Sequence, residues 1–304
     1  MRYSRVCTLT PGHAMTLDAS LVGYQTRWFE HRLDARWAMA YAAALDDMQP
    51  CYFDDTTTAL AVHPVFPVCL EWPALVDSLG ANGVDMRRTV HATHDLELLT
   101  ALTPPLDVRS RATVIGVEQR RPGIYLGWRF DTVDADGRPL ARTWQGNLFL
   151  GETLRGPARW DQALPPHAPT PLSAPSRLTL HAAAGLAHTY TECARIWNPL
   201  HTEMAVAAAA GMARPPLHGT ATLALAVSAL VARCLGGDPR RVRRLGGRFN
   251  ALVMLPCALD LAWEDEPAAH RLRFEVGDAD GGRAIRGGFL DYLPPDTAGH
   301  STDR

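Results

Sequence analysis

The chain has 304 residues, of which 47% are hydrophobic, and its formal net charge is -2. This length and composition predict a globular protein of one large or two ordinary domains, and we favour two. The charge excludes a general electrostatic attraction to nucleic acid or to an anionic membrane.

The cysteines and apolar segments indicate the cellular compartment of the protein. No Cys-x-x-Cys pair occurs, so neither a zinc site nor a disulfide framework is indicated, and a reducing cytoplasm fits best. The first residues carry positive charge without an apolar stretch behind them, and the longest apolar run is too short to cross a bilayer. We therefore expect a cytoplasmic protein without a metal or cofactor. The six cysteines are Cys7, Cys51, Cys69, Cys193, Cys234 and Cys257.

The first half of the chain reads as helices followed by strands. Residues 1–20 predict a first strand or an arm, 28–45 a helix, and 62–79 a proline-punctuated segment that continues as a helix. The hydrophobic period then changes to alternation, which predicts strands, with a hairpin turn at Asp134–Gly137. Residues 156–175 are rich in proline and alanine and predict a linker. The predicted strands are 90–98, 108–117, 123–133 and 140–150.

The second half repeats this order. Tyr190–His201 aligns with Tyr41–Tyr52, 149 residues earlier, and each segment has a proline nine positions after its tyrosine. Asp278–Gly281 likewise repeats the turn at Asp134–Gly137. Two matched landmarks in one order indicate an internal duplication. The predicted elements are helices at 203–211 and 220–235 and strands at 248–255, 258–264, 271–276 and 284–292.

The repeat predicts the domain organisation. We divide the chain into an N-terminal domain, 1–155, the linker, 156–175, and a C-terminal domain, 176–304. The helix at 220–235 is apolar nearly all round, which indicates burial. We expect an α+β fold in which each half wraps an antiparallel sheet around a long buried helix.

Two turns in the second half carry the candidate chemistry. Asn198 can cap the next turn and Pro199 suits a first helical position, so both orient His201, whose ordinary pKa near neutrality suits a general base. At the second turn Gly219 leaves room for a carbonyl to approach backbone N–H groups at the start of a helix. His218 is expected to shape that turn. A base beside an oxyanion site is what reversible addition of water to an enoyl thioester requires.

These motifs resemble those of the MaoC-like, (R)-specific enoyl-thioester hydratases and dehydratases, which have the hotdog fold. The resemblance covers most of the chain and implies a tandem double hotdog. The family pattern Gly-Asp-x-Asn-Pro-x-His falls on Asn198, Pro199 and His201, but its aspartate position holds Ile196 and its glycine position holds Arg195. The resemblance implies that His201 is the base, that Asn198 helps to hold water, and that the Gly219 amide supports the oxyanion.

The first half has a complementary pattern at the equivalent positions. Asp47 stands at the aspartate position, whereas Gln49 and Tyr52 replace the asparagine and the histidine. In double hotdog relatives one half usually keeps its site and the other widens an acyl tunnel. We therefore expect the second half to be the working one. Because Asp47 should lie across the pseudo-twofold axis, the candidates for a substitute acid are Glu192, Arg195 and Glu203.

Further residues are candidates for binding the substrate. The resemblance implies an acyl thioester of coenzyme A or of an acyl carrier protein, and the basic run 240–248 would suit the phosphates or acidic groups of either carrier. The same run also reads as a solvated face, and His91 and His94 read as structural. The candidate binding residues are Arg195, Trp197, His218, Thr220, Arg244 and Arg248.

Alternative functions follow from Ile196, which cannot move a proton. Arg195 could instead meet the carboxylate of a branched or carboxylated acyl-CoA. The site could also be repurposed as an isomerase or for a cyclising addition, or the protein could bind acyl chains or a partner without catalysis. An open tunnel at His201 would favour an enzyme, whereas Trp197 or Ile196 plugging it would favour a scaffold. A homodimer and a monomer both remain open.

Overall fold

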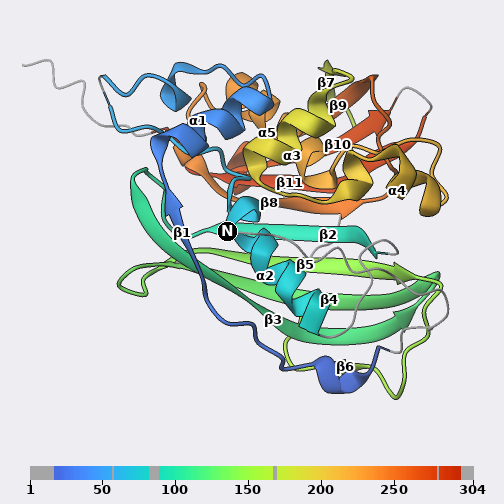
Figure 1. Cartoon of the computed structure of the whole chain (residues 1–304). Helices are drawn as coiled ribbons and strands as arrows, with labels where there is room; N and C mark the ends of the chain where they lie inside the picture. Colours follow the sequence, from blue (N-terminus) through green and yellow to red (C-terminus); the bar gives the residue numbers. More distant parts are fainter. Residues whose placement is uncertain (1–16, 57, 82–88, 167–169, 279–280, 296–304) are drawn as a thin grey trace, which may run out of the picture.

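The strands of the chain form one continuous antiparallel sheet (Figure 1). The computed structural model describes residues 17–56, 58–81, 89–166, 170–278 and 281–295. Within these residues the strand order is β1-β3-β4-β5-β2-β8-β11-β10-β9-β7, and β6 pairs with β3. The strands are β1 (Phe29–Leu33), β2 (Thr89–Leu98), β3 (Leu106–Arg120), β4 (Gly123–Asp134), β5 (Pro139–Leu150), β6 (Arg159–Trp160), β7 (Ser176–Ala182), β8 (Val242–Phe249), β9 (Cys257–Glu266), β10 (Arg271–Asp278) and β11 (Arg283–Tyr292).

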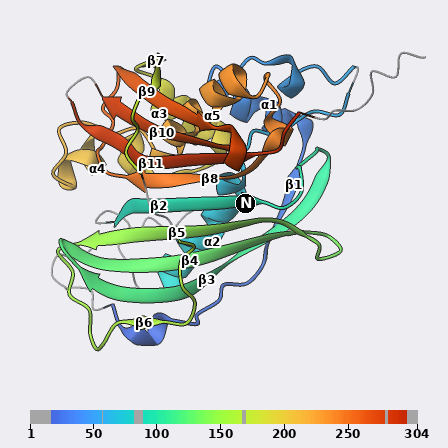
Figure 2. The same ribbon diagram turned by 180° about the vertical axis from the view of Figure 1, so that it is seen from behind.

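The helices lie against one face of this sheet, and the view from behind shows the strands in front of them (Figure 2). The longest, α5, is buried along most of its length because its residues are apolar nearly all round. Within the described residues, no helix combines the length and the apolar character needed to cross a membrane. The helices are α1 (Ala35–Ala44), α2 (Pro67–Ala81), α3 (Leu186–Ala194), α4 (Met204–Ala209) and α5 (Gly219–Cys234).

The two halves have the same strand order and meet at the pairing of β2 with β8. β1-β3-β4-β5-β2 corresponds to β7-β9-β10-β11-β8, strand for strand. At the seam Leu96 pairs with Leu245, which lies 149 residues later. The hydroxyls of Tyr41 and Tyr190, also separated by 149 residues, are 3.3 Å apart. Equivalent residues touch one another only near a symmetry axis, so an internal pseudo-twofold axis passes through this seam.

Several predicted elements are confirmed. The strands predicted between residues 90 and 150 are β2 to β5, and the helices predicted to end near Leu79 and to begin near Thr220 are α2 and α5. The turn at Asp134–Gly137 closes the β4–β5 hairpin, and Gly137 has a φ of +85°, which a residue with a side chain rarely adopts. The turn predicted at Asp278–Gly281 and the arm predicted at 1–20 lie partly outside the described residues, as does Cys7.

Two predictions of local structure were wrong. Residues 28–45 are not one helix: Phe29–Leu33 forms β1, paired with β3, and α1 begins after Asp34, whose carboxylate accepts a hydrogen bond from the Trp37 N–H. The strand predicted at 248–255 is instead β8, Val242–Phe249, which begins and ends six residues earlier. β8 is flanked by β2 and β11, so pairing on both sides stabilises an arginine-rich strand that its sequence did not reveal.

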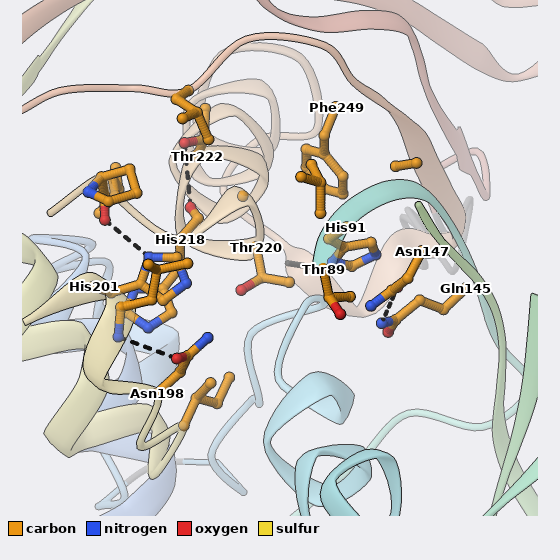
Figure 3. A pocket seen from close by; sticks show the side chains of 18 of the residues that line it. Thr89, His91, Gln145, Asn147, Asn198, His201, His218, Thr220, Thr222 and Phe249 are labelled. Carbon is orange, nitrogen blue, oxygen red and sulfur yellow. Dashed lines mark hydrogen bonds between the residues drawn. The ribbon is translucent and has the colours of Figure 1, made fainter. Parts of the chain in front are cut away.

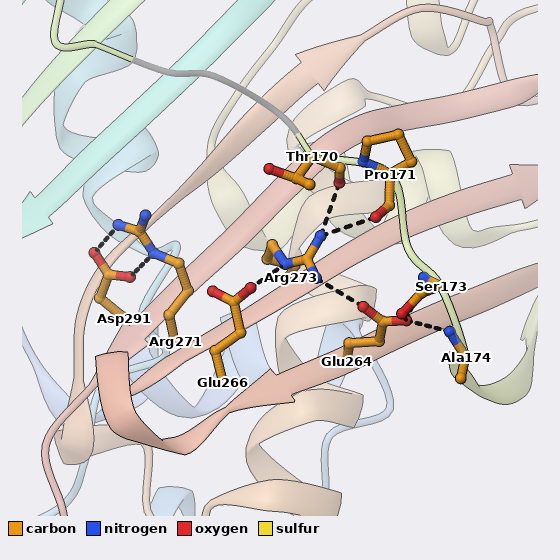
Figure 4. A network of polar contacts seen from close by, with 9 residues as sticks. All are labelled: Thr170, Pro171, Ser173, Ala174, Glu264, Glu266, Arg271, Arg273 and Asp291. Atoms are coloured by element: carbon orange, nitrogen blue, oxygen red, sulfur yellow. Dashed lines mark hydrogen bonds and ion pairs between the residues drawn. The ribbon is translucent and has the colours of Figure 1, made fainter.

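The predicted linker is attached to the sheet at both ends. Its first part contains β6, and Trp160 covers Gly116, where a Cβ atom would clash with the indole ring. Near its other end the Arg273 guanidinium donates to the carbonyls of Thr170 and Pro171 at 2.9 and 3.1 Å and pairs with Glu264 (Figure 4). Residues 167–169 lie outside the described residues. The described parts of this segment are therefore packed against the strands of both halves.

Candidate active site

A cavity of about 480 Å³ lies where the two halves meet (Figure 3). The C-terminal half contributes the loop from Ile196 to His201, the turn before α5, and the segment after β8. The N-terminal half contributes one face of α2 together with residues of β2 and β5. A cavity of this size and largely apolar lining is typical of a small-molecule site. Both halves are therefore required to form it.

His201 lines the cavity with a neutral imidazole ring. Asn198 accepts a hydrogen bond from the Leu200 N–H at 3.1 Å and caps a short 3-10 turn, Pro199–His201, so the motif acts locally as predicted. His201 Nδ1 lies 2.9 Å from the Pro216 carbonyl oxygen. A carbonyl can only accept, so Nδ1 carries the proton and Nε2 keeps its lone pair. Burial lowers the pKa of His201 to about 4, which keeps the ring neutral at pH 7.

His218 holds the ring of His201 in place. The two imidazoles stack with centroids 3.7 Å apart. His218 Nε2 is 3.3 Å from the Thr191 hydroxyl, so this ring contacts α3 and not its own turn, which it was expected to shape. Burial, followed by the neighbouring His201, depresses the pKa of His218 well below its usual value. The ring of His218 is therefore neutral at pH 7, as is that of His201.

Gly219 begins α5 at the wall of the cavity. A Cβ atom at this position would lie 3.1 Å from the Phe249 ring, so the close packing favours glycine. The first N–H groups of a helix have no partner within the helix and carry partial positive charge. Thr220, the next residue, also lines the cavity, and its hydroxyl accepts a hydrogen bond from Tyr190 at 3.1 Å. This turn can therefore stabilise a negatively charged oxygen.

The position of the family aspartate is part of the apolar wall. Ile196 is buried and lines the cavity beside Asn198. Arg195 adopts a left-handed conformation at the end of α3, and its guanidinium lies 3.8 Å from the centroid of the Trp37 ring. Trp197 is 51% exposed and donates to Glu192. The described residues that line the cavity do not include Arg195, Trp197, Glu192 or Glu203.

The structure also places the two candidate binding residues of β8, Arg244 and Arg248, away from the cavity lining. Arg244 forms a two-point ion pair with Asp95 on β2, at 2.8 and 2.7 Å. Arg248 precedes Phe249, which lines the cavity. Because neighbouring side chains of a strand point to opposite faces, Arg248 faces the other side of the sheet. Earlier in the run, Arg240 donates to the Ala59 carbonyl at 2.6 Å.

The equivalent site of the N-terminal half is closed. Gln49 donates to Asp47 at 3.0 Å, and Tyr52, at the position of His201, is fully buried. His63 is 3.0 Å from the Ser228 hydroxyl. The hollow next to His63 measures only about 20 Å³. An acyl substrate does not fit there, so of the two equivalent positions only the second opens into a large cavity.

The sequence reasoning missed the polar residues that the N-terminal half adds to the cavity. Glu71 projects from α2, and Gln145 and Asn147 project from β5. All three are buried. One signal was available: Thr143, Gln145 and Asn147 alternate along a strand as i, i+2 and i+4, so polar residues share one face of β5.

We expect the stability of the protein to be greatest near pH 6.5. Burial lowers the pKa of six histidines, so the unfolded chain binds more protons than the folded one from about pH 4 to 6.5, and stability rises across that range. Burial raises the pKa of Glu71 to about 8, so its contribution declines as the pH rises from 4.5 to 8. Urea unfolding from about pH 4 to pH 8 tests both the rise in stability below pH 6.5 and the decline above it. Glu71→Gln should flatten only the decline. An unchanged midpoint from neutral to acidic pH would contradict the prediction. The histidines are His31, His63, His91, His94, His201 and His218.

Comparisons with known proteins agree with this architecture. No family model matches the chain. An enoyl-CoA hydratase of Mycobacterium tuberculosis is 25% identical over 233 residues, which cover 71% of this chain and 77% of that protein. The peroxisomal enoyl-CoA hydratase 2 of Arabidopsis thaliana is 43% identical over 57 residues, 19% of this chain. The chain matches 18% and 30% of the length of the first two curated relatives.

Solved structures show the fold. The structure of a MaoC-like dehydratase from Phytophthora capsici superposes with a TM-score of 0.81 at 19% identity and covers 92% of this chain and 98% of its own. Another neighbour is described as a double hotdog protein. The predicted fold class is confirmed: this chain is a double hotdog protein. Its homologues and structural neighbours include enoyl-CoA hydratases, a 3-hydroxyacyl-thioester dehydratase and MaoC-like dehydratases, as the sequence motifs indicated.

Proposed function

We propose that this protein catalyses the reversible hydration of enoyl thioesters, equivalently the dehydration of (R)-3-hydroxyacyl thioesters, carried on coenzyme A or an acyl carrier protein. The observation that carries the proposal is the open cavity lined by His201, with its proton on Nδ1, and by the first turn of α5. Ile196 forms part of the wall and Trp197 is exposed, so neither plugs the site. A scaffold protein would have no need of this combination.

The chemistry can proceed with a single base. In dehydration, His201 Nε2 removes the proton from the α carbon while N–H groups at Gly219 and Thr220 stabilise the charge on the thioester oxygen. The C–O bond at the β carbon then breaks, and the same imidazolium returns the proton to the departing hydroxyl, which leaves as water. Asn198 holds the hydroxyl or water with its amide. This cycle balances without the carboxylate that Ile196 replaces.

The proposal gives substrate-contacting roles to residues at the cavity only. His201, Asn198 and Gly219 form the catalytic set, and Thr220 and His218 support it. Arg195, Arg244 and Trp197 contact other protein groups, so we assign them to structure. Arg248, on the other face of the sheet, has no role in the chemistry. An encounter of Arg195 with a substrate carboxylate is not part of the proposal.

The test is a direct measurement of hydration. Short, long and mesaconyl-like enoyl-CoAs are incubated with the protein, and both the loss of the enoyl absorbance and the gain in mass of one water are followed. We expect both signals with at least one substrate. Loss of absorbance without a gain in mass would favour the isomerase alternative, in which His201 moves a proton and no water adds. No reaction with any enoyl-CoA or with the matching carrier-protein thioesters would refute the proposal.

A further inference from the structure

The N-terminal half gives the cavity a buried polar wall. Glu71, Gln145 and Asn147 line the cavity with exposed fractions of 3%, 6% and 4%. A plain alkyl chain needs no such groups, and a buried polar group without a partner is costly. Pocket specificity usually comes from a few polar groups placed in an apolar lining. We therefore expect the ligand of the cavity to form hydrogen bonds with this wall.

One carboxyl oxygen of Glu71 has a hydrogen-bond partner, and the other has none among the described residues. Its Oε1 accepts a hydrogen bond from the Thr143 hydroxyl, and its Oε2 is buried without a partner among the described residues. Burial raises the pKa of Glu71 to about 8, with a smaller contribution from Asp131 and against the effect of the Thr143 hydrogen bond. At neutral pH the side chain is therefore a carboxylic acid, which can donate as well as accept.

The two amides of β5 extend this wall. Gln145 and Asn147 lie on the same face of the strand, and Gln145 Nε2 donates to Asn147 Oδ1 at 2.8 Å. This arrangement leaves Gln145 Oε1 as an acceptor and Asn147 Nδ2 as a donor. In Figure 3 the pair lies at the opposite side of the view from His201, with Thr220 between them. A ligand reacting at His201 can thus extend toward the amides.

The charge of the lining restricts what such a ligand carries. Among the described residues that line the cavity there is no lysine and no arginine. A substrate carboxylate would find no counter-ion among these described residues, so its burial here would have a large cost. A neutral ketone or hydroxyl needs only hydrogen bonds, which an acid and two amides supply.

Building on the proposed function, we infer that the acyl group of the substrate carries an uncharged hydrogen-bonding oxygen, a ketone or a hydroxyl, beyond the reacting carbons. Glu71 and Asn147 donate to this oxygen, and Gln145 accepts from it when it is a hydroxyl. The wall thus selects oxygenated acyl chains over plain alkyl chains of the same length. Sites built to hydrogen-bond a substrate reject analogues that lack the polar group far more strongly than apolar pockets reject a missing methylene.

The inference is tested by binding, without turnover. Saturated acyl-CoAs cannot be hydrated, so calorimetry can compare a plain chain with chains of equal length that carry a ketone or a hydroxyl at successive positions. We expect at least one oxygenated analogue to bind about tenfold or more tightly than the plain chain. Glu71→Gln, which keeps a donor and the size of the side chain, should retain most of this preference. Glu71→Leu should abolish it.

Each outcome decides the matter. Equal binding of plain and oxygenated chains by the unaltered protein, or no binding of either, would overturn the inference. So would an equal loss of affinity for both in Glu71→Leu, because the preference for oxygenated chains would then not depend on Glu71. Preference for oxygenated chains together with no hydration would support the binding wall while refuting the proposed function. Hydration of plain enoyl-CoAs without any such preference would support the proposed function while refuting the binding wall.

Discussion

Replacing His201 with alanine should lower the rate of enoyl-thioester hydration by about 10²- to 10⁴-fold, the usual contribution of a positioned general base. The ring is oriented by its Nδ1 hydrogen bond to Pro216 and by stacking on His218, which leaves Nε2 as the basic atom in the cavity. The position of the aspartate in the resembled motif holds Ile196, so that position supplies no second base. The measurement is the initial rate on the best substrate of the enoyl-CoA panel.

Two variants separate the base from its surroundings. In His201→Asn the amide can still donate to the Pro216 carbonyl, so the loop should keep its shape while activity falls as in the alanine variant. His181→Ala changes an exposed histidine on β7 and should leave the rate unchanged. Activity of His201→Asn near that of the unaltered protein would show that the imidazole only positions the loop, and another group would then have to be the base.

Removing the carboxylate of Asp95 should lower the free energy of unfolding by about 3–5 kcal/mol, as is typical when one partner of a buried ion pair is lost. Asp95 lies on β2, is 9% exposed and binds Arg244 of β8 through both oxygens. The pair crosses the seam between the two halves. Asp95→Ala leaves the half-buried guanidinium without its partner, and urea unfolding measures the cost.

An exposed ion pair provides the matched control. Arg32 and Asp107 are 2.6 Å apart across β1 and β3, but both side chains are more than half exposed. Asp107→Ala should therefore cost about 1 kcal/mol or less. Replacing Asp95 and Arg244 together should cost less than Asp95→Ala alone, since no unpaired charge remains. Equal effects of Asp95→Ala and Asp107→Ala would contradict the assigned role of the seam.

The strands of the first half were predictable because apolar residues recur along them, partly in alternation, between residues that favour turns. Alternation of buried and less buried residues is clear in the first part of β3 and the last part of β4, and turn residues such as Asp134–Gly137 separate the strands. This pattern failed for β8, where Arg243, Arg244 and Arg248 occupy a central strand. Their placement depends on Asp95 and other partners distant in the chain, so no local pattern reports it.

The local chemistry of the site was determined by the sequence itself. Asn198 caps the next turn, Pro199 begins it and Gly219 starts α5, and each of these effects acts within a few residues. The cavity and its polar wall were decided only by the tertiary structure. Glu71 and Asn147 line the same cavity as His201 because β2 and β8 pair across the seam and place the two halves side by side. Contacts between residues separated by a hundred positions depend on that pairing, which no short stretch of the chain encodes.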